Sequence, residues 1–156
     1  MSFTSTLIGK LIMTFLTAMV PVVELRGAIP VGVGMGLTPF VSFIVSVLGN
    51  MVPVPIVILF IRQILNFMKK APNLRTLAEK IEGKAGKHED KIKRYQSLGL
   101  LILVAIPLPG TGAYTGSLVA SLFDIRLKTA VPVIFAGVVI AGIIVTIITY
   151  GFVLVI

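Results

Sequence analysis

An acid and a base stand inside an apolar stretch near the start of the chain, in the sequence PVVELRGAIP at residues 21–30. Glu24 and Arg26 are two residues apart, and Gly27 and Pro30 follow them. Ionisable side chains at membrane depth are costly, so they indicate a functional site by default. A carboxyl removed from water is a candidate proton carrier, because burial disfavours its charged form. A guanidinium stays charged and can bind a carboxylate or phosphate through two hydrogen bonds.

The spacing of this pair bears on the local backbone. On a regular helix, side chains two residues apart do not face the same way. We therefore expect unwound backbone around Glu24 and Arg26, at the tip of a hairpin, where both side chains could reach one cavity. The alternative is an ion pair at the membrane interface, beside an ordinary spanning helix.

A second break, IPLPGTGAYTG, occupies residues 106–116. Its prolines end one helix, its glycines free the backbone, and the amides that open the next helix can then point into a cavity. Hydroxyl groups beside a helix N-terminus favour binding of an anion or a polar headgroup. An alternative role is helix packing, since Gly112, Gly116 and Ala120 recur at four-residue spacing. The candidate binding residues are Pro107, Pro109, Gly110, Thr111, Gly112 and Tyr114.

A third polar position, Asn50, lies in a long apolar run shortly before Pro53 and Pro55. Proline has no amide hydrogen, so the two prolines free carbonyl groups within the helix. Asn50 could line a path through the membrane. A kink whose carbonyls are satisfied by neighbouring helices is an equally good interpretation.

Composition argues against an enzyme and against a metal or cofactor. The chain has no cysteine and one histidine, so it predicts no disulfide and no zinc site. No His/Asp/Glu metal cluster, no Ser/His pair and no second acid near Glu24 is apparent in the sequence. Of its 156 residues, 56% are hydrophobic and 13% charged, which is typical of a membrane protein. The length favours a single domain.

The apolar segments divide into long and short ones. Residues 40–67 and 129–156 are 28 residues each, long enough to cross a bilayer, which needs about 20. Residues 7–23, 28–37, 97–106 and 113–123 are shorter, and the two breaks separate them in pairs. The short segments therefore predict two helical hairpins, each entering and leaving the membrane on one side.

The two halves of the chain match in the order of their elements. Three positions recur 86 residues later: Pro21, Gly27 and Pro30 correspond to Pro107, Ala113 and Gly116. A re-entrant hairpin plus one crossing helix makes an odd number of crossings, so the second copy must be inverted. We predict an all-α integral membrane fold, an inverted repeat in a single domain over residues 1–156. Its parts are a first repeat at about 6–67, a basic loop at 68–96 and a second repeat at about 97–156. Inverted repeats with broken helices are typical of transporters.

The rival topology has five ordinary spans, at residues 7–23, 27–48, 49–67, 97–123 and 129–156. It gives no reason for PLPGTG inside the fourth span, because irregular backbone at membrane depth needs a cavity or protein cover. We therefore favour the hairpins.

Positive charge sets the predicted orientation. Residues 62–94 hold ten bases and four acids, and the short link at 124–128 adds Arg126 and Lys128. Basic loops lie preferentially in the cytoplasm. We expect a multi-pass protein of the cytoplasmic membrane with loop 68–96 inside, both termini outside, and a basic helix of that loop on the inner headgroups. Nucleic-acid binding is a poorer explanation of this charge.

The two motifs together, PVVELRGAIPVG and IPLPGTGAYTG, resemble the small multi-drug export family of prokaryotic membrane proteins over residues 15–151. More distantly, the paired proline-bearing hairpins resemble the DedA/VTT superfamily of lipid carriers and scramblases. That resemblance implies facing re-entrant hairpins and movement of lipid phosphates such as undecaprenyl phosphate. It also implies that Glu24 is a hairpin acid and that Arg26 and Arg126 correspond to essential bases. The chain lacks the longer Arg-x-Phe-x-Pro type stretch of that superfamily.

The expected function is a proton- or ion-coupled secondary transporter or flippase for a small amphipathic or lipid-phosphate substrate. One alternative is an exporter of cationic drug-like amphiphiles, which Glu24 would bind directly. Another is a non-transporting membrane scaffold or assembly protein, in which Glu24 and Arg26 form a structural ion pair. Expected partners are membrane lipids and a second copy of the chain, since two hairpins and two crossing helices barely enclose a cavity.

Overall fold

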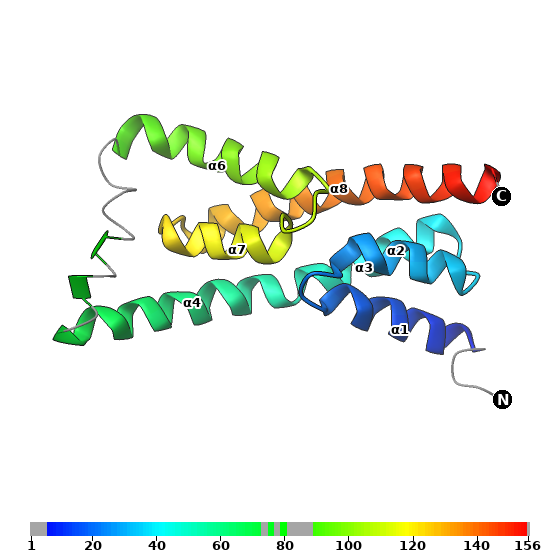
Figure 1. Cartoon of the computed structure of the whole chain (residues 1–156), viewed down its shortest axis with the longest axis horizontal. Coiled ribbons are helices and arrows are strands. Elements are labelled where there is room, and N and C mark those ends of the chain that lie inside the picture. Colours follow the sequence, from blue (N-terminus) through cyan, green and yellow to red (C-terminus); the bar gives the residue numbers. More distant parts are fainter. Residues whose placement is uncertain (1–5, 73–74, 77–78, 81–88, 156) are drawn as a thin grey trace.

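The computed structural model describes residues 6–72, 75–76, 79–80 and 89–155, and in these ranges it contains helices and no strand (Figure 1). Half of the predicted basic helix at 74–95, including residues 81–88, lies outside the described residues. The helices are α1 (Leu7–Met19), α2 (Glu24–Gly34), α3 (Pro39–Met51), α4 (Pro53–Lys70), α6 (Glu89–Ala105), α7 (Ala113–Leu122) and α8 (Leu127–Val155).

Two long apolar helical stretches form the frame of the molecule. By length and composition, Pro39–Lys70 and Leu127–Val155 could each cross a membrane. The first stretch comprises α3 and α4, which run nearly end to end and meet at Val52 (Figure 1). The junction follows from Pro53 and Pro55, which cannot donate the amide hydrogen bonds that continue a helix.

The shorter helices are arranged in two pairs. The pair α1 and α2 lies at the right end of the molecule in Figure 1, and the pair α6 and α7 lies at the left end. The breaks within the pairs, residues 20–23 and 106–112, both lie near the middle (Figure 1). The start of α1 and the end of α8 share the right end, whereas α4 ends and α6 begins at the left end.

Some of the helix boundaries predicted from the sequence are confirmed, and others are wrong. The predicted turn at Thr38 and Pro39 is present: Thr38 caps α3, its hydroxyl accepting from the Val41 amide at 3.3 Å. α2, however, begins at Glu24, so Glu24 and Arg26 lie in its first turn and the unwound segment precedes them. The rival spans 27–48 and 49–67 do not occur, because α2 ends at Gly34 and α3 continues into α4.

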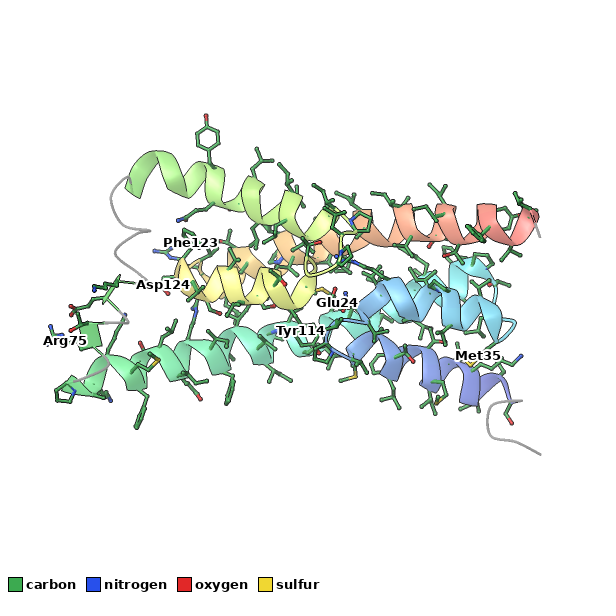
Figure 2. The ribbon with its side chains drawn as sticks, viewed as in Figure 1. Glu24, Met35, Arg75, Tyr114, Phe123 and Asp124 are labelled. Atoms are coloured by element: carbon green, nitrogen blue, oxygen red, sulfur yellow. The ribbon has the colours of Figure 1, made fainter. Side chains whose placement is uncertain are left out.

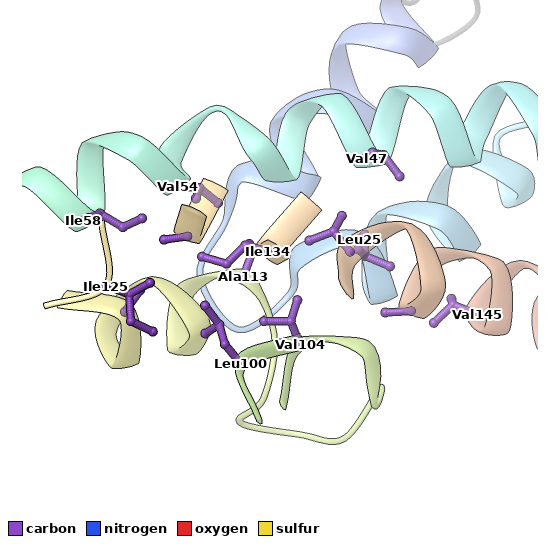
Figure 3. Packing of buried hydrophobic residues seen from close by; sticks show 14 of the residues in the cluster. Leu25, Val47, Val54, Ile58, Leu100, Val104, Ala113, Ile125, Ile134 and Val145 are labelled. Carbon is purple, nitrogen blue, oxygen red and sulfur yellow. The ribbon is translucent and has the colours of Figure 1, made fainter. Parts of the chain in front are cut away.

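The buried apolar core joins both helix pairs to both long helices. Figure 3 shows Leu25 of α2, Val54 of α4, Val104 of α6 and Ile134 of α8 meeting around Ala113, the first residue of α7. All five are at most 2% exposed. The core is therefore centred where the two breaks lie, and many large apolar side chains around the outside are exposed.

Close packing of α6 on α8 depends on Gly137. A Cβ built at this glycine would lie 2.7 Å from Val104 Cβ and 3.2 Å from the Leu101 carbonyl oxygen. We expect Gly137→Ala to destabilise the fold by about 1–3 kcal/mol, because overfilling a packed interface forces the helices apart. Thermal unfolding in detergent measures this as a lower Tm. Gly151→Ala on the same helix is the matched control, since its added Cβ meets nothing within 4 Å. Equal Tm values for the two variants would contradict the prediction.

Candidate functional site

The candidate site lies where the two breaks meet at the middle of the molecule. Figure 2 shows Glu24 and Tyr114 close together there, far from Met35 at one end and Asp124 at the other. Residues 82 to 90 positions apart in sequence are joined by hydrogen bonds across this meeting point. Sequence analysis predicted both breaks as binding elements, and the structure adds that they bind each other.

Glu24, the first residue of α2, caps the helix that follows the second break. Its side chain is buried, with 4% of the residue exposed, and its Oε1 accepts a hydrogen bond from the Tyr114 amide at 3.2 Å. Tyr114 is the second residue of α7, and Gly112, the residue before α7, provides no side-chain cap. A carboxylate at a helix N-terminus satisfies a free amide and interacts favourably with the helix dipole.

Gly112 allows this approach. A Cβ built on it would lie 2.0 Å from Glu24 Oε2, and its φ of +135° is one that other residues rarely adopt. The carboxylate therefore lies directly against the backbone of the second break. Gly112, which was predicted to free the backbone, also leaves room for the carboxylate of Glu24.

Arg26 binds the carbonyl oxygens of the second break. Its guanidinium donates to the carbonyls of Leu108 and Thr111, and Nη2 also lies 2.9 Å from the Thr111 hydroxyl oxygen. Both carbonyls lie in the second break, between the end of α6 at Ala105 and the start of α7 at Ala113, and so outside a helix. Arg26 adds a charged donor to both carbonyls, and such hydrogen bonds are stronger than neutral ones. The Leu108 carbonyl also accepts from the amide and the hydroxyl of Thr111.

Tyr114 makes the reciprocal contact to the first break. Its hydroxyl donates to the carbonyl of Met19, the last residue of α1. Each pair of helices thus provides a side chain that binds the open helix end of the other pair. The three contacts together form a clamp, which we define as Glu24, Arg26, Thr111 and Tyr114.

The first break has a strained backbone. Val22 has φ +78° and Glu24 has φ +48°, in the left-handed region that is unfavourable for residues with a side chain, and most of all for a β-branched one. Such strain persists only where surrounding contacts enforce it, and it is common at sites that change conformation. The clamp provides contacts of this kind.

Comparison with family models gives a match over most of the chain. A family model described as "Putative small multi-drug export protein" matches residues 24–144, from the start of α2 through the second break and into α8. The chain belongs to this family. Searches of curated proteins and of solved structures returned no match. Family membership and the two long apolar helices support a membrane location and a role in transport.

Not every predicted site residue of this export-family member reaches the clamp. Gly27 lies in α2 against Val23, and Pro30 lies farther along α2 on an exposed surface. Arg126 is exposed in the link between α7 and α8. The structure therefore separates Arg126 from Glu24, with the length of α7 between them.

Asn50 is fully buried in the last turn of α3. Neither its amide nitrogen nor its amide oxygen has a hydrogen-bond partner among the described residues. Pro107, Pro109, Gly110, Thr111 and Gly112 all lie in the second break, as predicted.

Sequence analysis of this family member missed a contact at the cytoplasm-facing end of the predicted topology. Arg62 of α4 donates to the carbonyl of Ile125 and lies 3.8 Å from the Asp124 carboxylate. It joins α4 to the link between α7 and α8. The signal available in the sequence was a lone base within the apolar part of α4.

An apolar groove of about 640 Å³ lies outside the clamp, between the end of α2 and the end of α8. Its lining residues are Pro30, Val33, Gly34, Ile148, Thr149, Phe152 and Val153. With the apolar side chains exposed along the last turns of α8, the groove belongs to the outer surface of this export-family protein and is separate from the hydrogen-bonded centre.

Proposed function

We propose that this protein is a proton-coupled secondary transporter of small amphipathic molecules in the cytoplasmic membrane. The observation that carries the proposal is the buried carboxylate of Glu24, which holds the N-terminus of α7 at the meeting point of the two breaks. Glu24 is a buried acid at a contact between the two helix pairs, so its protonation can be coupled to their separation.

The proposed architecture is the inverted repeat. In it α1 and α2 enter from one side, α6 and α7 enter from the other, and the stretches Pro39–Lys70 and Leu127–Val155 cross the bilayer. In support of this arrangement, the two breaks lie near mid-length, and a 13-residue helix such as α1 is only about 20 Å long. With loop 68–96 in the cytoplasm, α1 and α2 open outward and α6 and α7 open inward.

The coupling step follows from the chemistry of the carboxyl. Ionised Glu24 is held by the amide of Tyr114 and by the dipole of α7. Protonation removes the charge, so the interaction with the helix dipole is lost and the clamp is weakened. The strained backbone at Val22 and Glu24 favours rearrangement once the clamp opens. Access can then alternate between the two sides around one fixed site.

The substrate class follows from the residue that changes charge. The other five acids of the chain are at residues 79–90 and 124, away from the clamp in sequence. A cationic amphiphile would compete with protons, and with the N-terminus of α7, for Glu24. Competition for one carboxylate gives exchange, in which an entering proton displaces an outgoing cation. The family description, multi-drug export, is consistent with such substrates.

A lipid phosphate is the second candidate, and Arg26 favours it. Once the clamp opens, the guanidinium loses its carbonyl partners and can bind phosphate in a bidentate manner. Leu108, Pro109 and Gly110 of the second break are exposed, so a headgroup could reach this site. In this case Arg26 would bind the phosphate of the moving lipid, and Glu24 would control the opening of the clamp.

The surroundings of the proposed transporter are lipid and a second copy. Exposed apolar side chains extend along α4 and α8, including Phe60, Phe67, Phe152 and Leu154. We propose that these surfaces contact acyl chains and that part of the α8 surface pairs with another copy in a homodimer.

Accessibility of single cysteines tests the architecture. The chain has no cysteine, so single cysteines at residues 22–30 and 108–116 give a clean background. Each would be treated with an impermeant thiol reagent from one side of the membrane at a time. We expect the first set to react only from outside and the second only from inside. Reaction of both sets from both sides, or a symmetrical loss of reaction across each segment, would contradict the hairpins.

Transport in proteoliposomes tests the activity. With a pH gradient imposed, we expect tetraphenylphosphonium to move against the proton flow in vesicles containing the protein. A fluorescent short-chain polyprenyl phosphate, followed by quenching at the outer leaflet, tests the second candidate. Movement of neither probe, with the cysteine pattern intact, would favour the scaffold alternative.

A further inference from the structure

A buried polar stripe extends along α3. Ser42, Ser46 and Asn50 are spaced four residues apart, so they share one face of the helix, and each is 0% exposed. The remaining residues of α3 are mostly apolar. A row of three buried polar side chains in a helix that could cross a membrane is costly unless each has a hydrogen-bond partner.

The stripe is satisfied at one end only. The Ser42 hydroxyl donates to the Ile29 carbonyl at 2.9 Å. The Ser46 hydroxyl oxygen and both polar atoms of the Asn50 amide have no hydrogen-bond partner among the described residues. Native proteins seldom leave buried polar groups unpaired, and bound water is the usual partner when protein atoms are not. The two unsatisfied side chains are one helical turn apart and can share such a partner.

The unsatisfied end lies at the depth of Glu24. α2 and α3 are joined by a short turn and run antiparallel, and Ser42 lies against Gly32, whose added Cβ would be 2.2 Å from its hydroxyl oxygen. Eight residues separate Ser42 from Asn50 along α3, and eight separate Gly32 from Glu24 along α2. Both separations amount to about 12 Å along the helix axis, so Asn50 and Glu24 lie at one level.

A second observation places Asn50 at the same level. Val54 follows Asn50 by one turn and belongs to one buried cluster with Ala113 and Leu25 (Figure 3). Ala113 follows Gly112, the residue against which the Glu24 carboxylate lies, and Leu25 follows Glu24. The end of the polar stripe and the acid therefore border the same part of the core.

The chemistry of the unsatisfied groups identifies the ligand. Asn50 presents a donor and an acceptor, and Ser46 presents a hydroxyl that can be either. A metal cation would bind the oxygens and leave the Asn50 amide hydrogens unpaired. Water accepts and donates, so it can satisfy all three atoms.

We propose that Ser46 and Asn50 hold bound water inside the protein at the depth of Glu24. Together with Ser42, this water forms a row of polar groups that extends toward the turn between α2 and α3. Its presence does not depend on transport. If the protein is the proton-coupled transporter proposed above, this water is the route by which Glu24 exchanges protons with the α1–α2 side.

Radiolytic hydroxyl-radical footprinting of the full-length protein in nanodiscs tests for the water. Radicals formed from bound water oxidise adjacent side chains even where bulk water cannot reach. We expect oxidation of the buried Val47 and Val54 in the unmodified protein, and its loss in Asn50→Leu, which keeps the side-chain size. Ser46→Ala is a second variant, with the same expectation. Ser117→Ala is the control, because the Ser117 hydroxyl is buried but donates to the Ala113 carbonyl at 2.7 Å.

Stability gives an independent outcome. If the polar atoms were dry and unpaired, replacing Asn50 by leucine would remove a penalty and raise Tm. If they bind water, we expect Tm to stay equal or fall. Absence of oxidation at Val47 and Val54 in the unmodified protein, or a higher Tm for Asn50→Leu, would overturn the proposal.

The proton route is tested separately by infrared spectroscopy. At low pH the carboxyl C=O band that Glu24→Gln removes is assigned to Glu24, and its shift in D2O reports hydrogen exchange. We expect Asn50→Leu to slow this exchange by at least about tenfold. Unchanged exchange in a variant that has lost its water would overturn the route. It would leave the proposed function intact, because that function is tested by transport in Glu24→Gln.

Discussion

Transport driven by a pH gradient falls to the level of empty vesicles when Glu24 is replaced by glutamine; this is the largest functional effect that we expect. Glutamine keeps the size of the side chain and an oxygen that can accept from the Tyr114 amide at the present 3.2 Å. It cannot bind or release a proton, and it has no charge to offer a cationic substrate. Fluorescence of an entrapped pH indicator, recorded with tetraphenylphosphonium outside the vesicles, measures the loss.

Folding provides the control for this variant. The lost charge at the N-terminus of α7 costs about 0.3–1 kcal/mol, so Glu24→Gln should remain folded with a slightly lower Tm. Glu79→Gln is a matched carboxyl change outside the clamp, in an exposed i,i+4 pair with Arg75, and it should transport normally. Undiminished proton-driven transport by Glu24→Gln would exclude Glu24 from the mechanism. If the unmodified protein folds but does not transport, the scaffold alternative is favoured.

The pairing of the helices could be predicted because it depends on local rules. Clusters of proline and glycine favour helix ends, so the motifs at residues 21–30 and 106–116 indicated both breaks, although Pro30 itself lies inside α2. Apolar length alone predicted both long helical stretches, now seen as Pro39–Lys70 and Leu127–Val155. Helix starts were less accessible: the sequence predicted unwound backbone around Glu24 and Arg26, whereas α2 begins at Glu24.

The contacts within the site could not be predicted from the sequence, because they join residues more than 80 positions apart. Both Glu24 and Arg26 were singled out as binding residues for a substrate. In the structure Arg26 donates to the carbonyls of Leu108 and Thr111, partners that no local pattern specifies. The Ser46 and Asn50 pair did have a local signal, the four-residue spacing of polar residues in an apolar helix, whose importance depends on burial that only the fold reveals.

The second prediction with a large expected effect is that Gly112→Ala separates the two breaks. The added methyl group would lie 2.0 Å from Glu24 Oε2, and φ of +135° is unfavourable for alanine. Either the carboxylate leaves the N-terminus of α7 or the second break moves, and both outcomes undo the clamp. If the collision costs about 1–3 kcal/mol, the population with separated breaks rises by about 5- to 150-fold.

The rate at which a buried cysteine reacts measures this population. Leu25→Cys places a thiol beside Glu24 at a position that is 2% exposed, so N-ethylmaleimide reacts with it only when the breaks separate. Gly112→Ala should accelerate the reaction by that factor, whereas Gly99→Ala, whose added Cβ meets nothing within 4 Å, should not. Both variants replace glycine with alanine, so they are compared directly. A general loosening of the fold would lower Tm as well as accelerate the reaction. Equal reaction rates for the two variants at unchanged Tm would mean that the carboxylate of Glu24 does not lie against Gly112. That contact would then not be part of the site.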